Sequence, residues 1–439
     1  MNARLLRRAW ACAAVSGLLA GSLAARALSL QGAKSEASPA RASTIVVFPF
    51  EDIGKAGELD WLEEGLAELA RTRLVGHGPA VFTRAERLAA LEKLGLPSYA
   101  HFSRATMLKI AAEIDADYVV FGEFAAQDKT VRVTERVLSV NPARLSAPLA
   151  ETGSLDALAD LQGRLAWRAL CEVQAGASPG AACGTASPAA QQFLQNATPL
   201  RADAFEFYIR GVMSAEDEAR LRDLREASRL APDWEEPIFA TARTYYARRD
   251  CEAALQWYAR ITPLSVHAQQ AGFDSGVCRL LRNDPIGAEA SFSALAGTTA
   301  PAAGATDTAE PEVLNNLGAA LLREARYKDA LVEFARAQRL DPGEPDYWFN
   351  IGLAQYLGAD WDAAPQALQE ALRLQPDDTQ AKSLLAVALD RSGQDDEAKA
   401  LRAELATDSG AKKDPTKMDA TTIGRMVRAK MELNVGAER

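Results

Sequence analysis

The sequence predicts an α+β multidomain protein in which a small α/β domain precedes an all-α solenoid. Residue types recur with a period of 34 positions in the C-terminal half, and a repeat of this length indicates stacked helical units. Residues 43–175 instead alternate β-branched, apolar runs with helical periods. Hydrophobic residues make up 48% of the chain and aromatic residues 7%, a composition typical of a helix-rich globular protein. The 439 residues suffice for two or three domains.

The periodicity is clearest before Pro342 and Pro376, which lie 34 residues apart. The first segment is defined by Leu314, Leu317, Gly318, Leu321, Ala330, Phe334 and Ala337. Shifting that set by one period gives Trp348, Ile351, Gly352, Gln355, Ala364, Leu368 and Ala371. This order of large and small residues, closed by a proline, resembles the tetratricopeptide (TPR) repeat. The resemblance implies pairs of antiparallel helices that approach closely at the glycines, with each proline ending a second helix.

Extending the register predicts six repeat units. Further units begin at Arg201, Glu235, Gln269 and Thr379. The expected boundaries are repeats 1–3 at 201–296, an inserted loop at 297–310 and repeats 4–6 at 311–405. Small residues, glycine and proline dominate the inserted segment, which is typical of a loop.

The α/β prediction for residues 43–175 rests on local patterns. Strands are expected at 43–52, 80–83, 117–124, 130–140 and, as a fourth main strand, 146–152. Helices are expected at 59–76, 85–94, 103–114 and from Ser154 onward. Intermixed helices and strands of this kind favour one compact α/β layer structure.

Four segments of this region carry a family resemblance: Val-Val-Phe-Pro-Phe-Glu-Asp (46–52), Leu-Asp-Trp-Leu-Glu-Glu-Gly-Leu (59–66), Ala-Asp-Tyr-Val-Val-Phe-Gly-Glu (116–123) and Val-Arg-Val-Thr (131–134). They resemble the N-terminal domain of TolB-like proteins, which precedes TPR repeats in many bacterial chains. Residues 204–211 also look like the sequence that opens those repeats. The resemblance implies architecture and not activity, and we expect no cyclase, kinase or DNA-binding domain here.

The first 27 residues have the pattern of a secretory signal peptide. A basic start at Arg4, Arg7 and Arg8 precedes an apolar run over 9–25, and Ala25-Arg26-Ala27 offers small residues for cleavage. The alternative is an uncleaved anchor that tethers the chain to the inner membrane. In either case residues 28–42 would be a linker, and the rest would lie in the periplasm or be secreted.

Charge and cysteine content bear on partners and compartment. Cleavage removes four arginines, which lowers the formal net charge from −10 to −14, so nucleic acid is not expected as a partner. Four cysteines remain, and an even count in an oxidising compartment favours disulfides. We expect Cys251–Cys278 between antiparallel repeat helices and Cys171–Cys183 near the linker at 176–200; buried free thiols are the alternative.

Motifs for catalysis, cofactors or metals are not found in the sequence. His77, His101 and His267 do not share metal-ligand spacing, and there is no phosphate-binding loop or nucleophile elbow. We therefore expect no catalytic, cofactor-binding or metal residues and no enzyme. A pocket with converging polar side chains in the α/β domain would favour the rival hypothesis of an enzyme.

The expected binding surface is a groove lined by the first helix of each repeat. Its outward positions are Phe239, Arg243, Tyr246, Asn315, Leu322, Arg323, Phe349, Leu353 and Tyr356. Aromatic residues with a few arginines suit an extended peptide or a helix from a protein partner. The alternative is that the groove packs against the chain's own tail. No repeated Lys/Asn/Arg arrangement for clamping a terminal carboxylate is present, so chaperone tails are not expected ligands.

The tail, residues 406–439, is predicted to contain an amphipathic helix over 418–434. The apolar positions with helical spacing are Ile423, Met426, Val427 and Met431. This helix would cap the last repeat, or else bind a membrane surface or a partner. Together the sequence predicts an exported envelope scaffold that binds a protein through its repeats. The rival is an accessory regulator of an envelope complex that acts through its TolB-like domain.

Overall fold

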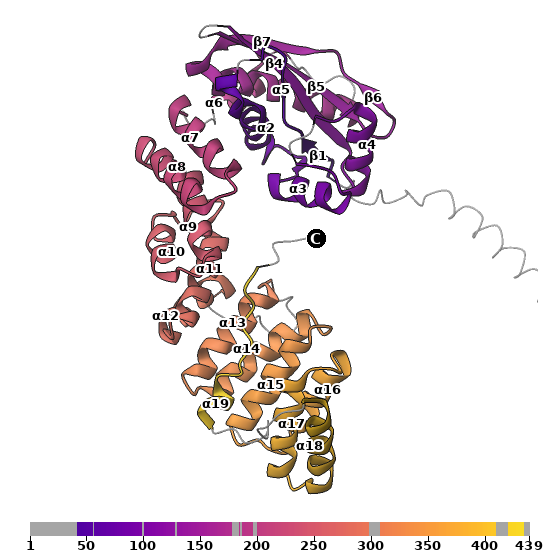
Figure 1. Ribbon diagram of the computed structural model, residues 1–439, viewed down its shortest axis with the longest axis vertical. Coiled ribbons are helices and arrows are strands. Elements are labelled where there is room, and N and C mark those ends of the chain that lie inside the picture. The colour runs from indigo at the N-terminus through magenta and orange to yellow at the C-terminus, as the bar shows by residue number, and fades with distance from the viewer. Residues whose placement is uncertain are drawn as a thin grey trace, which may run out of the picture.

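The structure, a computed structural model, has an α/β domain at one end and a curved stack of helices leading away from it (Figure 1). It describes residues 42–55, 57–98, 101–127, 130–177, 184, 187–195, 200–297, 308–409 and 420–433. The leader at 1–27, the linker at 28–41 and Cys183 lie outside the described residues, as does most of the inserted loop. No helix in the described part is long and apolar enough to cross a membrane.

One mixed sheet forms the centre of the α/β domain. Its strands are β1 Thr44–Val47, β2 Glu51–Asp52, β3 Ala80–Val81, β4 Tyr118–Gln127, β5 Thr130–Ser139, β6 Arg144–Leu145 and β7 Leu149–Ser154. The order is β3-β1-β4-β5-β6, with β2 beside β4 and β7 beside β5. Strand β4 is parallel to β1 and β2 and antiparallel to β5, while β5 is antiparallel to β6 and β7. A strand lies within each expected range, although the single strand expected over 43–52 is two strands, β1 and β2.

Helices cover both faces of this sheet. Helices α2 (Trp61–Leu74) and α5 (Leu158–Ala177) pack on one face with Ile45 and Val47, whereas α3 (Arg84–Lys93) and α4 (Arg104–Glu113) pack on the other with Val46 and Phe48. Successive β1 residues thus enter opposite cores, which explains why the strand is apolar throughout. Short 3₁₀ helices occupy Gly57–Leu59 and Leu155–Ala157. The arrangement confirms an α+β architecture, and the TolB-like identity remains a prediction.

The helical region consists of consecutive antiparallel pairs. The pairs are α7 Ala202–Met213 with α8 Asp217–Leu230, α9 Glu235–Ala247 with α10 Cys251–Tyr258, α11 Ala268–Leu281 with α12 Pro285–Ala296, α13 Pro311–Arg323 with α14 Tyr327–Leu340, α15 Pro345–Leu357 with α16 Ala364–Leu374, and α17 Thr379–Arg391 with α18 Asp395–Ser409. Helices α14 and α16 end at the same distance before Pro342 and Pro376. These prolines therefore occupy equivalent corners of successive pairs.

Glycines mark where the helices of a pair approach most closely. A Cβ atom added to Gly318 would lie 2.6 Å from the Phe334 ring, and one on Gly352 would lie 2.6 Å from Leu368 Cγ. Both aromatic and aliphatic partners are fully buried. The predicted repeat register is confirmed by these contacts, because only glycine leaves room for the facing side chain.

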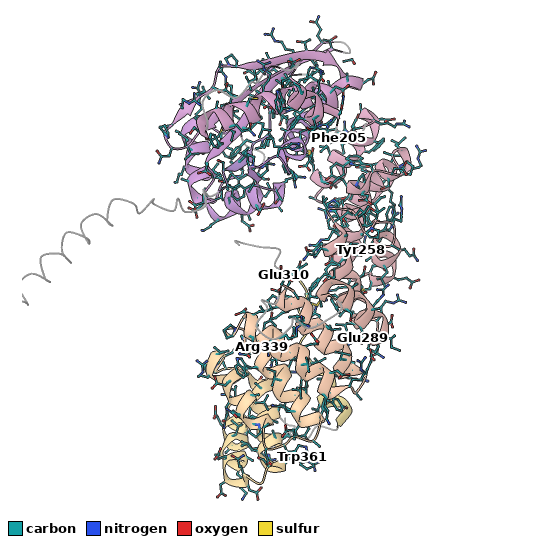
Figure 2. All side chains as sticks on the ribbon, turned by 180° about the vertical axis from the view of Figure 1, so that it is seen from behind. Phe205, Tyr258, Glu289, Glu310, Arg339 and Trp361 are labelled. Carbon is teal, nitrogen blue, oxygen red and sulfur yellow. The ribbon has the colours of Figure 1, made fainter. Side chains whose placement is uncertain are left out.

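The first helix pair packs directly onto the α/β domain. Phe205 of α7 lies against Trp61 of α2 at a ring-centroid distance of 5.9 Å, and Figure 2 shows Phe205 at the junction of the two parts. The linker expected over 176–200 is corrected in part, because helix α6 (Pro188–Gln195) lies within it. Phe193 of α6 is buried against Trp167, with ring centroids 5.4 Å apart. This short helix has few apolar residues, and it is stabilised by tertiary packing and not by its length.

Candidate functional site: the groove of the helical region

The tail of the chain lies along the face formed by the first helices of the pairs, α9, α13, α15 and α17, and we call this face the groove. From the short helix α19 (Ala420–Gly424) the yellow tail segment runs past α15 and α13 toward the α/β domain (Figure 1). We call residues Ile423–Leu433 the tail segment. Its direction is opposite to the order of the repeats, since Arg428 contacts α15, Lys430 contacts α13 and Met431 contacts α9.

Asn316 and Asn350, from successive repeats, each bind both backbone groups of one residue of the tail segment. The Asn350 side chain accepts a hydrogen bond from the Arg428 N–H at 2.9 Å and donates to the Arg428 carbonyl at 2.8 Å. Asn316 does the same with Lys430, at 2.7 Å from the N–H and 2.8 Å to the carbonyl. Asn315 donates to the Arg428 carbonyl at 2.9 Å and accepts a bond from Asn350. Alternate residues of an extended chain expose these groups on one side, so the asparagines fit a β-like strand.

The Arg428 side chain fills a site built from an aromatic ring and two carboxylates. Its guanidinium lies 3.6 Å from the centroid of the Phe349 ring, and its Nη1 atom lies 3.0 Å from Asp346 and 2.6 Å from Asp378. Burial would raise the pKa of Asp378, but hydrogen bonds from Arg428 and from the Ala381 N–H hold it below its ordinary value. Stacking together with charge-assisted hydrogen bonds suits arginine better than lysine.

Lys430 occupies a second acidic site on the same helix terminus. Its Nζ atom lies 2.9 Å from Glu344 and 2.7 Å from Asp346. Burial would lower the pKa of Lys430, but the hydrogen bonds from its ammonium to Asp346 and Glu344 raise it above the ordinary value. Acidic groups in the first turn of α15 are also stabilised by the helix dipole. The groove thus binds two cations that are two residues apart.

The far end of the tail segment meets α9. The Tyr246 hydroxyl donates to the Met431 carbonyl at 2.5 Å, and Arg243 lies 3.6 Å from Glu432. The fully buried Asp274 binds Arg243. Its Oδ2 atom accepts hydrogen bonds from Arg243 at 3.0 Å and from the Tyr258 hydroxyl at 2.5 Å. This network fixes the position of the arginine, because leaving the buried carboxylate unpaired would be costly.

The amphipathic helix expected over 418–434 is wrong beyond Gly424. Helix α19 ends there, Arg425 and Met426 form a turn, and residues 427–430 continue outside any helix before a bend at 431–432. Ile423, Met426, Val427 and Leu433 are buried against the repeats. Their spacing allowed a helix, but the backbone of Arg428 and Lys430 bonds to asparagine side chains in place of its own helical turn. Tertiary contacts have thereby overridden a local periodicity.

The nine predicted groove residues have three kinds of environment. Arg243, Tyr246, Asn315 and Phe349 contact the tail segment, as described above. Leu322 and Leu353 are buried in the helical core, and Tyr356 packs against it. Phe239 stacks on His267 at 4.1 Å, and Arg323 donates to the Leu280 carbonyl at 2.5 Å.

The sequence reasoning missed the residues that make most of the contacts. These are Asn316, Glu344, Asp346, Asn350 and Asp378. A signal for two of them existed, because Asn316 and Asn350 lie one 34-residue period apart. Both are fully buried. An asparagine repeated at a buried position needs hydrogen-bond partners, and here the tail provides them.

Cys251 and Cys278 lie side by side in the groove's supporting core. Both are buried thiols in this structure. Burial and a hydrogen bond with Cys251 raise the pKa of the Cys278 thiol. The proximity expected from antiparallel helices is present, and the disulfide remains a prediction. Cys171 is buried in α5, and its proposed partner Cys183 lies outside the described residues.

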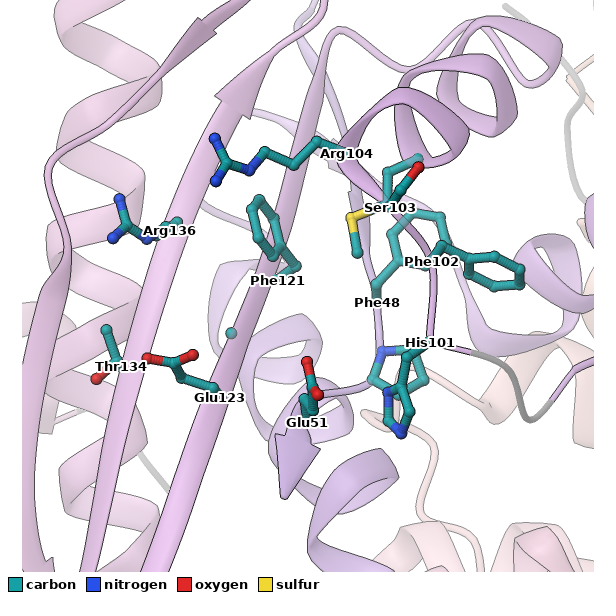
Figure 3. A pocket seen from close by; sticks show the side chains of 13 residues that line it. Phe48, Glu51, His101, Phe102, Ser103, Arg104, Phe121, Glu123, Thr134 and Arg136 are labelled. Carbon is teal, nitrogen blue, oxygen red and sulfur yellow. The ribbon is translucent and has the colours of Figure 1, made fainter. Parts of the chain in front are cut away.

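A second candidate site is a cavity of about 240 Å³ in the α/β domain. Figure 3 shows Glu51 and Glu123 toward one end of it and Arg104 and Arg136 toward the other, around Phe121. The two glutamates come from paired strands in direct register. Ser103 caps α4, because its side chain accepts a hydrogen bond from the Thr106 N–H. The converging polar side chains are the feature that the sequence analysis named in favour of an enzyme. The cavity suits a small ligand that carries both charges.

In the part of the chain that the structure describes, no group of three or more His, Cys, Asp or Glu residues is arranged so that it could hold a metal ion.

Comparison with known proteins gives structural similarity alone. No protein-family model and no curated protein sequence matches the chain. The solved structure of YrrB, described as a TPR protein with an unusual peptide-binding site, aligns at 18% identity over 43% of this chain and 93% of its own, with a TM-score of 0.36. MamA from Desulfovibrio magneticus RS-1 aligns at 16% identity over 40% and 94%, and the APC/C hetero-tetramer Cut9–Hcn1 at 16% over 52% and 43%, both with TM-scores of 0.36. At these scores the neighbours carry no information on partner or activity.

Proposed function

We propose that this protein is a non-catalytic scaffold that binds an extended segment of a partner protein in the groove of its helical region. One observation carries the proposal: the groove already holds a peptide strand through Asn316 and Asn350, which contact backbone groups present in any sequence. Main-chain hydrogen bonds supply affinity and side-chain pockets supply selectivity in this mode of recognition.

The proposed place of action is the cell envelope. The support is the leader pattern of the sequence, with its basic start, apolar run and Ala25-Arg26-Ala27. A periplasmic or secreted scaffold follows if the leader is cleaved, and a scaffold anchored in the inner membrane follows if it is not. N-terminal sequencing of protein recovered from the envelope fraction distinguishes the two, since a cleaved chain begins at residue 28.

Photo-crosslinking in cells tests the scaffold. A benzophenone amino acid at Arg249, whose Nη1 lies 3.9 Å from Met431 Sδ, places the probe in the groove. The matched control is the same amino acid at Val332, a 53% exposed position on a second helix. A discrete adduct from the groove position that is absent from the control supports the function. Identical adducts from both positions, or none besides the tail segment, contradict it.

The α/β cavity favours a second candidate function, in which this domain senses a small ligand with both charges. In that case the protein would act as an accessory regulator through its TolB-like domain. Arg136→Ala should abolish a ligand-induced rise in melting temperature, whereas Arg132→Ala on the same strand should not, because Arg132 does not line the cavity. Screening zwitterionic metabolites by thermal shift would show whether any such ligand exists.

A further inference from the structure

The groove of this chain is occupied before any partner arrives. Ten residues, 410–419, join the end of α18 to α19, and the tail segment then covers both asparagines and all three acidic groups of the groove. A partner that uses the same contacts must therefore displace the tail segment. This inference rests on the proposed function and concerns how that function is controlled and what the partner looks like.

We infer that the tail segment is a tethered mimic of the partner, and that the partner presents an extended segment with an arginine and, two residues later, a lysine or arginine. Backbone contacts from Asn316 and Asn350 set the register without selecting a sequence. The carboxylates of Asp346, Asp378 and Glu344 select for cationic side chains. An anionic or a short apolar side chain in either position would leave these carboxylates without a charged partner.

The order of the two cations is also specified. The first position offers the face of Phe349, which lies 3.6 Å below the Arg428 guanidinium, and the amide oxygen of Gln380 at 3.1 Å. A planar guanidinium uses both, whereas an ammonium uses neither well. The second position offers carboxylates around a single Nζ atom and a more distant ring, Tyr347 at 5.6 Å. It accepts either cation.

The tail segment is held by contacts that can exchange. The Arg428 and Lys430 side chains are 15% and 20% exposed, and no covalent bond fixes the segment among the described residues. A short tether gives an effective concentration on the order of 1 mM, so an intrinsic dissociation constant of ~10 µM would leave about one groove in a hundred open. The apparent affinity for a partner then falls by the same factor of about 100.

The test uses full-length chains and a labelled synthetic peptide with the sequence of residues 421–433. Arg428→Glu should expel the tail segment, because the new carboxylate would face Asp346 and Asp378. Arg425→Glu is the matched control, since Arg425 is exposed and its side chain makes no ion pair among the described residues. Hydrogen exchange of residues 426–433 reports tail release, and fluorescence anisotropy reports peptide binding.

We expect the peptide to bind the Arg428→Glu chain at least ~30-fold more tightly than the wild-type or Arg425→Glu chain. The same peptide with Arg428 and Lys430 changed to glutamate should bind none of them. Equal affinity for all three chains, with tail release confirmed by exchange, would overturn the inferred occlusion. Concentration-dependent dimers held by the tail segment would also overturn it, because a second copy would then be the occupant.

Two further outcomes separate this inference from the proposed function. If residues 426–433 of the wild-type chain exchange as fast as the free peptide, the tethered mimic is wrong, while a discrete crosslinked partner at Arg249 would still support the scaffold. If the tail is released and the peptide still does not bind, the groove is not a site for external segments. Both proposals then fail.

Discussion

The α/β domain closes its core on itself, whereas the helical region leaves one long face open and covers it with its own tail. Helices pack on both faces of the sheet, and the buried Glu135 has a single described partner, the Gln162 amide at 2.6 Å. Its Oε1 atom accepts no hydrogen bond. In the helical region the equally buried Asn350 uses both of its side-chain polar atoms, on Asn315 and on Arg428.

This difference shows what a buried polar residue indicates in each part. In a closed core no ligand can reach a buried polar residue, so burial destabilises its charged form and shifts its pKa. In a stack of repeats it points into a shared groove, where a segment from elsewhere satisfies it. Asn316 and Asn350 are therefore markers of binding, and Glu135 is a marker of pH sensitivity. Four experiments test the comparison.

The largest expected effect is on the repeat framework. Gly352→Leu should destabilise the helical region by roughly 1–3 kcal/mol, because any Cβ there meets Leu368. Hydrogen exchange should accelerate in α15 and α16 and stay slow in β4 and β5. Gly343→Leu is the control, since its Cβ would have only Asp341 as a neighbour, at 3.5 Å. An unchanged melting transition for Gly352→Leu would contradict the repeat register.

The closed core of the α/β domain should respond to pH. Burial raises the pKa of Glu135 from 4.5 to about 7, against the hydrogen bond from Gln162 that lowers it. Between these values the folded chain keeps a proton that the unfolded chain loses, so stability falls as pH rises through this window. Glu135→Gln should thus stabilise the domain by about 3 kcal/mol at pH 8 and by little at pH 4.5.

Denaturant unfolding at the two pH values measures this effect. Glu92→Gln, on the exposed face of α3, is the control. A Glu135→Gln chain that is less stable than the wild type at pH 8 would show that the carboxylate is well satisfied, and the contrast between the two regions would be lost.

A smaller effect is expected at the groove. Asn350→Ala removes hydrogen bonds to both backbone groups of Arg428, which should weaken the tail contact by about 1–2 kcal/mol. Exchange of residues 426–433 should rise about 5- to 30-fold, while the sheet is unaffected. Gln366→Ala, an exposed amide on α16, serves as the control. Unchanged tail protection would mean that side-chain ion pairs alone hold the segment.

The smallest effect is the pH response of the tail contact itself. The pKa of Asp378 is held below its ordinary value of 3.8. The stabilisation that Asp378 gives to the tail contact is therefore present above pH 3.8 and is lost as the pH falls through the lowered pKa. The pKa of Lys430 is raised above 10.5, so its contribution persists below 10.5. The hydrogen-exchange protection of the tail segment, corrected for intrinsic exchange, should not change between pH 5 and 9. The stability of the α/β domain should change with pH in the same range. A sharp change inside that range would contradict the assigned ion pairs.

How far the sequence predicted the site depended on the range of the interactions. Phe349 and Tyr246 were found because their positions follow from the repeat template. Asp346 and Asp378 were not, because a carboxylate at the start of a helix has an ordinary explanation as a cap, and Asp378 does accept bonds from the N–H groups of Gln380 and Ala381. Only the approach of Arg428 distinguishes binding from capping.

The sequence by itself determined the helix pairs and the approximate positions of the strands, because glycine, proline and alternating apolar residues act on their near neighbours along the chain. The path of the tail was decided by tertiary structure alone. Its apolar residues have helical spacing. Its carbonyl and N–H groups nevertheless bond to asparagines that lie more than 75 positions away in the sequence. A local sequence pattern cannot identify partners at that distance.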